Sequence, residues 1–158
     1  MKSFATIENL REMLDKKEVS PNEVVSFYRE RIAKYNPDLN AIIEVFNEND
    51  VDTKASGILN GIPGIIKDNI CQKGQIASAG SKILENFRAP YDATVTTRLK
   101  SAGAPVLGRG NMDEFAMGST GEFSVYGPSK NPWDTSRTPG GSSSGLSSCV
   151  AAGGPRSI

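Results

Sequence analysis

The clearest pattern of apolar and polar positions lies in residues 20–37, where apolar residues recur at helical spacing. Ser20 can cap a helix there, Pro21 suits its first position, and Glu23 completes a capping box. We expect this helix to end at Asn36-Pro37. Its apolar face, which must pack on another element, consists of Val24, Phe27, Tyr28, Ile32 and Tyr35.

The segments on either side predict a second helix and a first strand. Residues 6–14 have the spacing of a shorter helix. Residues 39–46, LNAIIEVF, are rich in branched apolar side chains, which is typical of a buried strand. Residues 47–57 are polar and predict a loop with one helical turn at most. The side chains expected to face inward from the shorter helix are Ile7, Leu10 and Leu14.

From Gly61 onward, short apolar runs alternate with a helical segment. GIPGIIKDN predicts a turn, a strand at Ile65-Ile66, and Lys67 at the end of that strand. PYDATVTTRLKSAG predicts a helix capped by Asp92 and stopped by Gly103, and the strand APVLG follows it. Strand, helix and strand in this order predict an α/β fold with a mixed, mainly parallel sheet flanked by helices.

The composition is that of an ordinary folded domain, with 158 residues, 37% hydrophobic and 23% charged. Lys+Arg and Asp+Glu both number 18, so no net charge attracts the chain to nucleic acid, and any such role would come through a partner. The apolar runs are too short for a membrane span, and the first residues do not have the apolar core of a signal peptide. We therefore expect a cytoplasmic or organelle-matrix protein without direct contact to DNA or membrane.

The absence of histidine from the sequence limits the catalytic chemistry. Without an imidazole there is no Ser-His-Asp triad, no Cys-His dyad and no HExxH zinc site, so a base must be Lys, Asp, Glu or Tyr. Cys71 and Cys149 are too far apart in the sequence for a metal motif and too few for a disulfide framework. We expect both to be small apolar filler, and we expect no bound metal.

The stretch TPGGSSSGLSSCVAAGG, residues 138–154, admits three interpretations. Its composition is that of a flexible linker. A glycine-rich phosphate cradle is a second candidate, but the GK[ST] ending is missing. A catalytic loop is the third. The segment NPWDTSRTPGG before the serine run and CVAAGG after it favour this interpretation, because a linker seldom lies between a tryptophan turn and a helix of small residues.

Five blocks that occur in order resemble the amidase signature family: GIPGIIKDN, YDATVTTRLKSAGAPVLG, GNMDEFAMGS, GPSKNPWD and RTPGGSSSG. NMDEFAMGS and NPWD resemble in particular its branch of glutaminase subunits from tRNA-dependent amidotransferases. The resemblance implies an amidase-signature α/β fold that is incomplete here. Residues 1–158 would be the N-terminal part of one amidase domain, with a helical segment at 1–60 and the first part of the catalytic core at 61–158. Arg109-Gly110 stands where lysine and threonine are common in the family.

The resemblance implies a Ser-cisSer-Lys site. The family's base lysine falls on Lys67, and its bridging serine, held by a cis peptide, falls on Ser142. A helix cap is the alternative role for Ser142. The motif that holds the nucleophilic serine and the oxyanion hole is expected beyond Ile158, so we expect both to be absent. The resemblance assigns a supporting loop to Gly140, Gly141, Ser143 and Ser144, and a substrate pocket to Met117, Gly118 and Ser119.

The implied activity is release of ammonia from glutamine for the ATP-dependent conversion of Glu-tRNA(Gln) to Gln-tRNA(Gln). The implied partners are a B subunit, which uses ATP and Mg and binds the tRNA, and a small C subunit; the chain itself would bind no cofactor. Asparagine remains open as the amide donor. A general amidase that acts on small amides is the alternative within the family. A non-catalytic remnant or interaction fragment is the alternative outside it, and we expect the 158-residue chain alone to be inactive.

Overall fold

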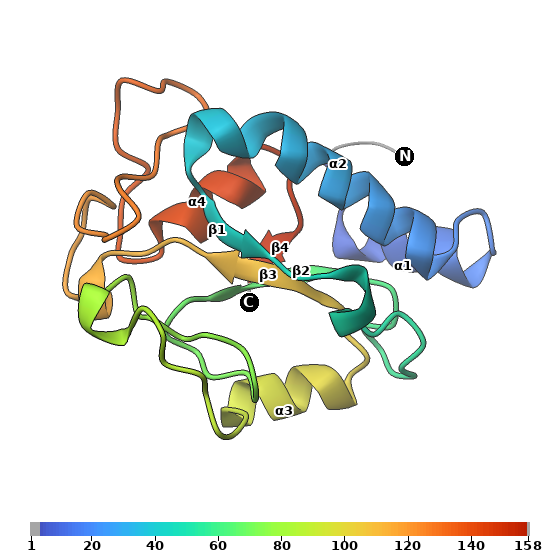
Figure 1. Cartoon of the computed structure of the whole chain (residues 1–158). Helices are drawn as coiled ribbons and strands as arrows, with labels where there is room; N and C mark the ends of the chain where they lie inside the picture. Colours follow the sequence, from blue (N-terminus) through green and yellow to red (C-terminus); the bar gives the residue numbers. More distant parts are fainter. Residues whose placement is uncertain (1–3, 158) are drawn as a thin grey trace.

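A sheet of four short strands lies between helices in the computed structural model of this chain, which describes residues 4–157 (Figure 1). The strand order is β1-β3-β2-β4, and β2 runs parallel to both of its neighbours, whereas β1 is antiparallel to β3. The mixed, mainly parallel sheet predicted from the sequence is therefore confirmed. The strands are β1 (Ile42–Val45), β2 (Gly64–Lys67), β3 (Val106–Gly110) and β4 (Arg156–Ser157).

Helices cover both faces of the sheet. Figure 1 shows α2 and α4 over one face and α3 beneath the other. α2 supplies five buried side chains of the apolar core described below, and α4 supplies Cys149. The helices are α1 (Ile7–Asp15), α2 (Pro21–Leu39), α3 (Thr94–Ser101) and α4 (Ser144–Ala151), with 3-10 turns η1 (Glu48–Asp50), η2 (Lys82–Leu84) and η3 (Glu114–Ala116).

The start of α2 is the one that the sequence predicts. The Ser20 hydroxyl accepts a hydrogen bond from the Glu23 backbone N–H at 3.2 Å, and the Glu23 carboxylate accepts one from the Ser20 N–H at 2.8 Å. In α1, Leu10 and Leu14 are buried as predicted. The prediction for Ile7 is wrong: its side chain is 41% exposed, because as the first residue of α1 it lies at the outer end of the apolar stripe.

The predicted end of α2 is also wrong, since the helix continues through Pro37 to Leu39. A proline in the last turn removes one helical hydrogen bond, and the burial of Leu39 offsets that loss. Asn40 then ends the helix in the left-handed conformation, with φ of 47°. The side chain of Asn36 accepts hydrogen bonds from the N–H groups of residues 41 and 42, so it joins the helix end to β1.

The remaining predicted elements are present, but β1 and the cap of α3 differ from the prediction. β1 is shorter than the predicted run because Leu39 belongs to α2. Asp92 does not cap α3: Ala93 occupies the N-cap position without a side-chain bond. The Asp92 carboxylate instead accepts hydrogen bonds from the Lys73 N–H at 2.7 Å and from the Lys100 ammonium at 2.8 Å. A charged partner and a backbone donor from another loop thus outcompete the local helix end.

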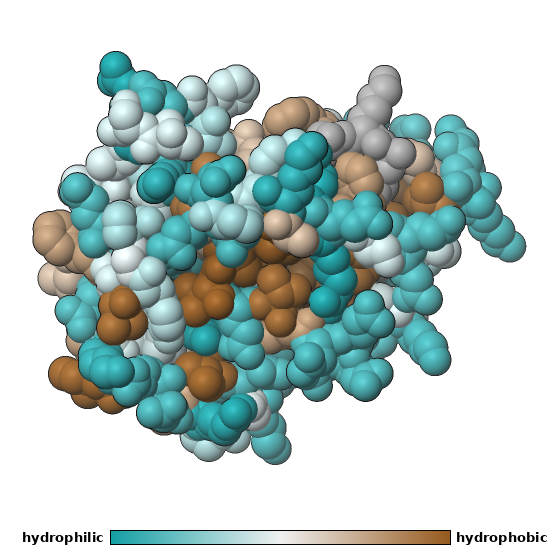
Figure 2. Space-filling view, turned by 45° about the horizontal axis from the view of Figure 1, so that its top comes forward, coloured by the Kyte–Doolittle hydropathy of each residue, from teal (hydrophilic) through white to brown (hydrophobic). Residues whose placement is uncertain are grey.

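The apolar core lies between the sheet and the helices α1, α2 and α4. Ile65, Ile66 and Leu107 from the two central strands are at most 1% exposed. Figure 2 shows that apolar residues also reach the surface, where they gather across the middle of one face within a polar surround. None of the helices formed by residues 4–157 is long and apolar enough to cross a membrane.

Candidate active site

The end of β2 carries the centre of the candidate site. Lys67 is the last residue of this strand and pairs in register with Gly110, the last residue of the parallel strand β3. The chain leaves β3, forms a long series of turns, and returns with Ser142 just before α4. The Lys67 ammonium nitrogen Nζ and the Ser142 hydroxyl oxygen Oγ lie 2.7 Å apart in a hydrogen bond, across 75 residues of sequence. The structure thus brings together the two side chains to which the family resemblance assigns the proton relay.

The backbone holds Ser142 at this position from both sides. The Gly141–Ser142 peptide bond is cis, as the resemblance implied. The carbonyl oxygen of Ser142 accepts a hydrogen bond from the Asp113 N–H at 3.1 Å. The N-cap position of α4 belongs to Ser143, whose side chain makes no capping bond. The helix-cap role is therefore not taken by Ser142, and its hydroxyl faces Lys67.

Two residues around Ser142, Gly141 and Ser144, make close contacts with the rest of the fold, which excludes the linker interpretation. Gly140 has φ of +83°, a conformation that favours glycine. A Cβ atom on Gly141 would lie 2.0 Å from the Asp113 carboxylate, so only glycine fits there. Ser144 is buried, and its hydroxyl donates to the hydroxyl of Ser129 at 3.2 Å. Composition alone does not reveal these close approaches.

Lys67 has the electrostatic character of a base. Burial is the largest influence and lowers its pKa, because a desolvated ammonium is disfavoured. The negative charge of Asp113 raises the pKa but does not cancel the effect of burial, so the net pKa lies below the ordinary value of 10.5. A larger share of Lys67 is therefore neutral near neutral pH than for an exposed lysine.

The predicted substrate-pocket residues lie on the loop that follows Asp113. Met117 is 84% exposed, Ser119 is exposed and Gly118 is half-buried. Among residues 4–157, none of these three makes a hydrogen bond to Lys67 or Ser142. Gly118 lies against Asp113, since a Cβ atom there would be 2.5 Å from the Asp113 Cγ. A role of the three in substrate contact remains a prediction.

A buried ionic network next to Lys67 was not predicted from the sequence. The Asp68 carboxylate accepts hydrogen bonds from the N–H groups of Ser78 and Gly80, at 3.2 and 2.9 Å, and forms an ion pair with Arg109. Arg109 also forms an ion pair with Glu44 at 2.8 Å. The position of Asp68 beside a strand-end lysine was the available signal, but its partners are distant in sequence.

The Asp68 carboxylate also fixes the turn at residues 78–80. The backbone of this turn is hydrogen-bonded to the loop beside the site. The carbonyl oxygen of Ala79 accepts from the Phe115 N–H at 2.9 Å, and that of Gly80 accepts from the Val125 N–H at 2.8 Å. The hydroxyls of Ser78 and Tyr126 lie 2.9 Å apart. Asp68 thus supports the loop that carries Asp113, while its neighbour Lys67 contacts Ser142.

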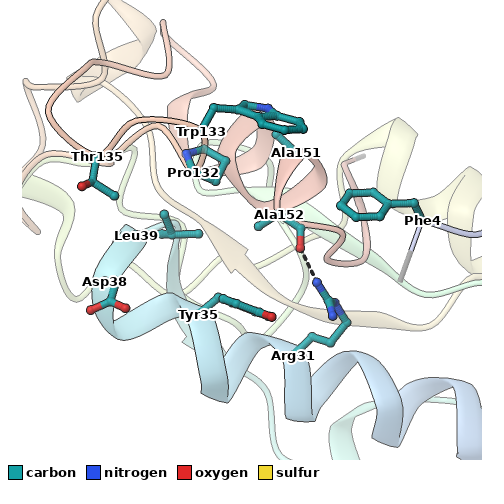
Figure 3. Close-up of a pocket in the computed structure, with 10 residues that line it drawn as sticks. All are labelled: Phe4, Arg31, Tyr35, Asp38, Leu39, Pro132, Trp133, Thr135, Ala151 and Ala152. Carbon is teal, nitrogen blue, oxygen red and sulfur yellow. Dashed lines mark hydrogen bonds between the residues drawn. The ribbon is translucent and has the colours of Figure 1, made fainter. Parts of the chain in front are cut away.

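A separate hollow of about 420 Å³ lies between α2, α4 and residues 132–135 (Figure 3). Tyr35 and Trp133 line it from opposite sides, and the Arg31 guanidinium donates hydrogen bonds to the carbonyl oxygens of Ala152 and Gly153. Neither Lys67 nor Ser142 lines this hollow, so it does not belong to the candidate active site.

The two cysteines do not form a disulfide with each other. Cys149 is buried in the apolar core, as expected of a filler residue, and burial raises the pKa of its thiol to about 12. Cys71 is half-buried, and both thiols are free. Within the part of the chain that the structure describes, no group of three Cys, Asp or Glu side chains is arranged to hold a metal ion.

Comparisons with known proteins agree with this geometry. The A subunit of a glutamyl-tRNA(Gln) amidotransferase from Azoarcus sp. (strain BH72) is 46% identical, over 94% of this chain and 32% of that protein. The crystal structure of the glutamyl-tRNA(Gln) amidotransferase A subunit from Thermotoga maritima matches with a TM-score of 0.74 and 38% identity, over 86% of this chain and 32% of the other. A 6-aminohexanoate cyclic dimer hydrolase matches with a TM-score of 0.91 and 29% identity, over 97% and 33%.

This chain therefore spans about a third of the length of the curated relatives it matches. The model of the amidase family matches residues 23–156, which include both Lys67 and Ser142. This match covers most of the sequence, and together with the relatives it establishes that the chain belongs to the amidase family.

Proposed function

We propose that this chain is the N-terminal part of the glutaminase subunit of a glutamyl-tRNA(Gln) amidotransferase, which releases ammonia from glutamine. The hydrogen bond of 2.7 Å between Lys67 and Ser142 carries the proposal, because it joins a base of lowered pKa to a hydroxyl. The identity of 46% to subunits of that name supports the choice of substrate.

In the proposed relay, neutral Lys67 accepts the proton of the Ser142 hydroxyl through the hydrogen bond that joins them. Ser142 in turn accepts the proton of a second serine, which attacks the carbonyl carbon of the glutamine side-chain amide. The proton on Lys67 then passes back through Ser142 to the amide nitrogen, which leaves as ammonia while the acyl-enzyme ester forms. Water hydrolyses this ester to glutamate, and one proton of the water returns to the second serine. We assign the attacking serine and the oxyanion hole to sequence C-terminal to Ile158.

The proposed partners follow from the use of ammonia. A B subunit would use ATP and Mg to activate Glu-tRNA(Gln) and would accept the ammonia, and a small C subunit would complete a heterotrimer. The relatives that support this are themselves named as A subunits of such an enzyme. Since such an enzyme acts on aminoacylated tRNA, a cytoplasmic or organelle-matrix location is part of the proposal.

One observation favours a second candidate, a general amidase that acts on small amides. The hydrolase of 6-aminohexanoate cyclic dimer superposes with a TM-score of 0.91, compared with 0.74 for the amidotransferase subunit from Thermotoga maritima. Its identity is lower, at 29% compared with 38%. The two candidates share Lys67 and Ser142 and differ in the amide that they hydrolyse.

The test is ammonia release by a version of this chain extended through the remaining part of the family fold, with the 158-residue chain as comparator. We expect the extended protein to hydrolyse glutamine and the 158-residue chain to show no activity. In the extended protein, Lys67→Met and Ser142→Ala should each lower the rate by about 10²–10⁴-fold.

Lys130→Met and Ser147→Ala are matched controls, because both residues are exposed and their side chains make no hydrogen bond within residues 4–157. Hydrolysis of small amides in place of glutamine would select the second candidate. Full activity of Lys67→Met would overturn the relay for both.

A further inference from the structure

Asp113 joins the site to the loop beside it through three hydrogen bonds. It follows β3 and precedes the turn η3, and it is 0% exposed. Its carboxylate accepts hydrogen bonds from the N–H groups of Gly121 at 3.1 Å and Phe123 at 3.0 Å. Its own N–H donates to the carbonyl oxygen of Ser142 at 3.1 Å. One residue thus fixes both the loop and the bridging serine.

Two glycines make room for this carboxylate. A Cβ atom on Gly141 would lie 2.0 Å from the Asp113 Oδ2, and a Cβ atom on Gly118 would lie 2.5 Å from the Asp113 Cγ. Neither glycine has a positive φ, so chain flexibility is not the reason for them. We infer that both are required by the close approach of a buried carboxylate to the backbone around Ser142.

Among the described residues, the buried charge of Asp113 has no fixed counter-ion. Within residues 4–157, no Lys or Arg lies in an ion pair with it, unlike Asp68, which pairs with Arg109. A buried carboxylate without a cation is costly unless hydrogen bonds and a nearby positive charge compensate. Asp113 is also the one charged group of the described residues whose field shifts the pKa of Lys67, and it raises that pKa against the effect of burial.

We propose that Asp113 is a positioning residue of the Lys67–Ser142 relay, whose backbone holds Ser142 and whose carboxylate supplies the counter-charge for protonated Lys67. This inference rests on the proposed function, in which Lys67 gains a proton during each cycle. An ammonium formed in a desolvated site is disfavoured without a nearby negative charge. Asp113 therefore keeps Lys67 basic enough to take the proton from Ser142, while burial keeps it neutral before the reaction.

The experiment is an NMR titration of the Lys67 side chain in the 158-residue chain, with the signal assigned by its loss in Lys67→Met. Asp113→Asn keeps the size of the side chain and removes its charge. It should lower the pKa of Lys67 by about one unit, because an attractive charge is lost. Glu122→Gln is the matched control: it removes one charge from an exposed position of the same loop and should leave the titration unchanged. An unchanged pKa of Lys67 in Asp113→Asn would overturn the proposal.

A second measurement needs no substitution and covers the case in which Asp113→Asn does not fold. The backbone amides of Gly121 and Phe123 donate to the carboxylate, so their signals in the wild-type chain should shift with the same midpoint as Lys67. Amide signals that stay constant through that transition would contradict the counter-charge role. Neither titration requires hydrolysis, so each can succeed or fail independently of the ammonia assay that tests the proposed function.

Discussion

Lys67 and Arg109 are two basic side chains at adjacent places in the sheet, and their surroundings differ in charge. Arg109, in β3, is 5% exposed and lies between the carboxylates of Asp68 and Glu44. Burial lowers the pKa of Arg109, but the two carboxylates raise it by more than burial lowers it. The net pKa therefore lies above its ordinary value, and the guanidinium stays charged. Lys67, at the end of β2, is hydrogen-bonded to the uncharged hydroxyl of Ser142, and burial lowers its pKa.

The end of β2 serves two purposes: Lys67 belongs to the candidate active site, and the next residue, Asp68, belongs to a structural ion pair. Successive side chains at the end of a strand point in opposite directions, so the Asp68 carboxylate turns toward Arg109 and away from Lys67. A carboxylate beside Lys67 would keep the lysine protonated and unable to act as a base. The Asp68 carboxylate therefore stabilises the buried Arg109 and does not pair with Lys67. The negative charge that acts on Lys67 is that of Asp113, whose effect on the pKa is weaker than that of burial.

Among the substitutions that test this comparison, Asp68→Asn should change the stability most. The substitution leaves Arg109 buried with Glu44 as its remaining carboxylate, and it weakens the turn at residues 78–80. We expect the free energy of unfolding to fall by about 3–5 kcal/mol, the usual cost of breaking a buried ion pair. Urea unfolding of the 158-residue chain measures it.

Asp134→Asn is the control for that substitution, because it breaks an exposed pair with Arg137. It should change the stability only slightly, since exposed ion pairs contribute little. An equal effect of Asp68→Asn and Asp134→Asn would show that the buried network does not stabilise the sheet.

A smaller effect is expected from Arg109→Lys, which retains the charge. The guanidinium bonds Asp68 and Glu44 through different nitrogen atoms, and one ammonium cannot reproduce that geometry. The loss of one charged hydrogen bond should lower the free energy of unfolding by about 1.5–3 kcal/mol. Unfolding by urea, followed in parallel with Asp68→Asn, tests the ranking. If Arg109→Lys lowered the free energy of unfolding as much as Asp68→Asn does, the fork geometry of the guanidinium would contribute as much to stability as the carboxylate.

The smallest effect is the dependence of stability on pH that Lys67 introduces. Its pKa is lowered in the folded chain, so between that pKa and 10.5 the unfolded chain binds more protons. Stability due to Lys67 should therefore rise as the pH rises through this window and be constant below it. The measurement is the difference in unfolding free energy between wild type and Lys67→Met at a series of pH values. A difference that falls with rising pH would mean that the pKa of Lys67 is raised instead.

Contacts that follow from a family motif were predictable, and so were contacts between near neighbours. The hydrogen bond between Lys67 and Ser142 was expected because each side chain lies in a recognisable block, GIIKDN or GGSSSG. The capping box of Ser20 and Glu23 was expected because its partners are three residues apart. Such short-range rules failed where tertiary partners competed, as at Pro37, where burial of Leu39 extends the helix, and at Asp92, which bonds Lys100.

Contacts between distant polar residues were not predictable from the pattern. Arg109 lies 41 residues from Asp68 and 65 from Glu44, and no periodicity shows that these three side chains face one another. Asp113 was part of a recognised block, but its role depends on space left by Gly118 and Gly141. The requirement for glycine at these two positions can be recognised only when the folded backbone places them against the Asp113 carboxylate.

The hydrogen bonds from Arg31 to the carbonyl oxygens that follow α4 affect the order in which contacts form while the protein is synthesised. The Arg31 guanidinium holds the carbonyl oxygen of Gly153 at 2.8 Å, a partner 122 residues later in the chain. A ribosome releases α2 long before that partner, so the loop must close across most of the sequence before the contact forms. We therefore expect this contact to form late in folding, only after residues 152–153 have left the ribosome.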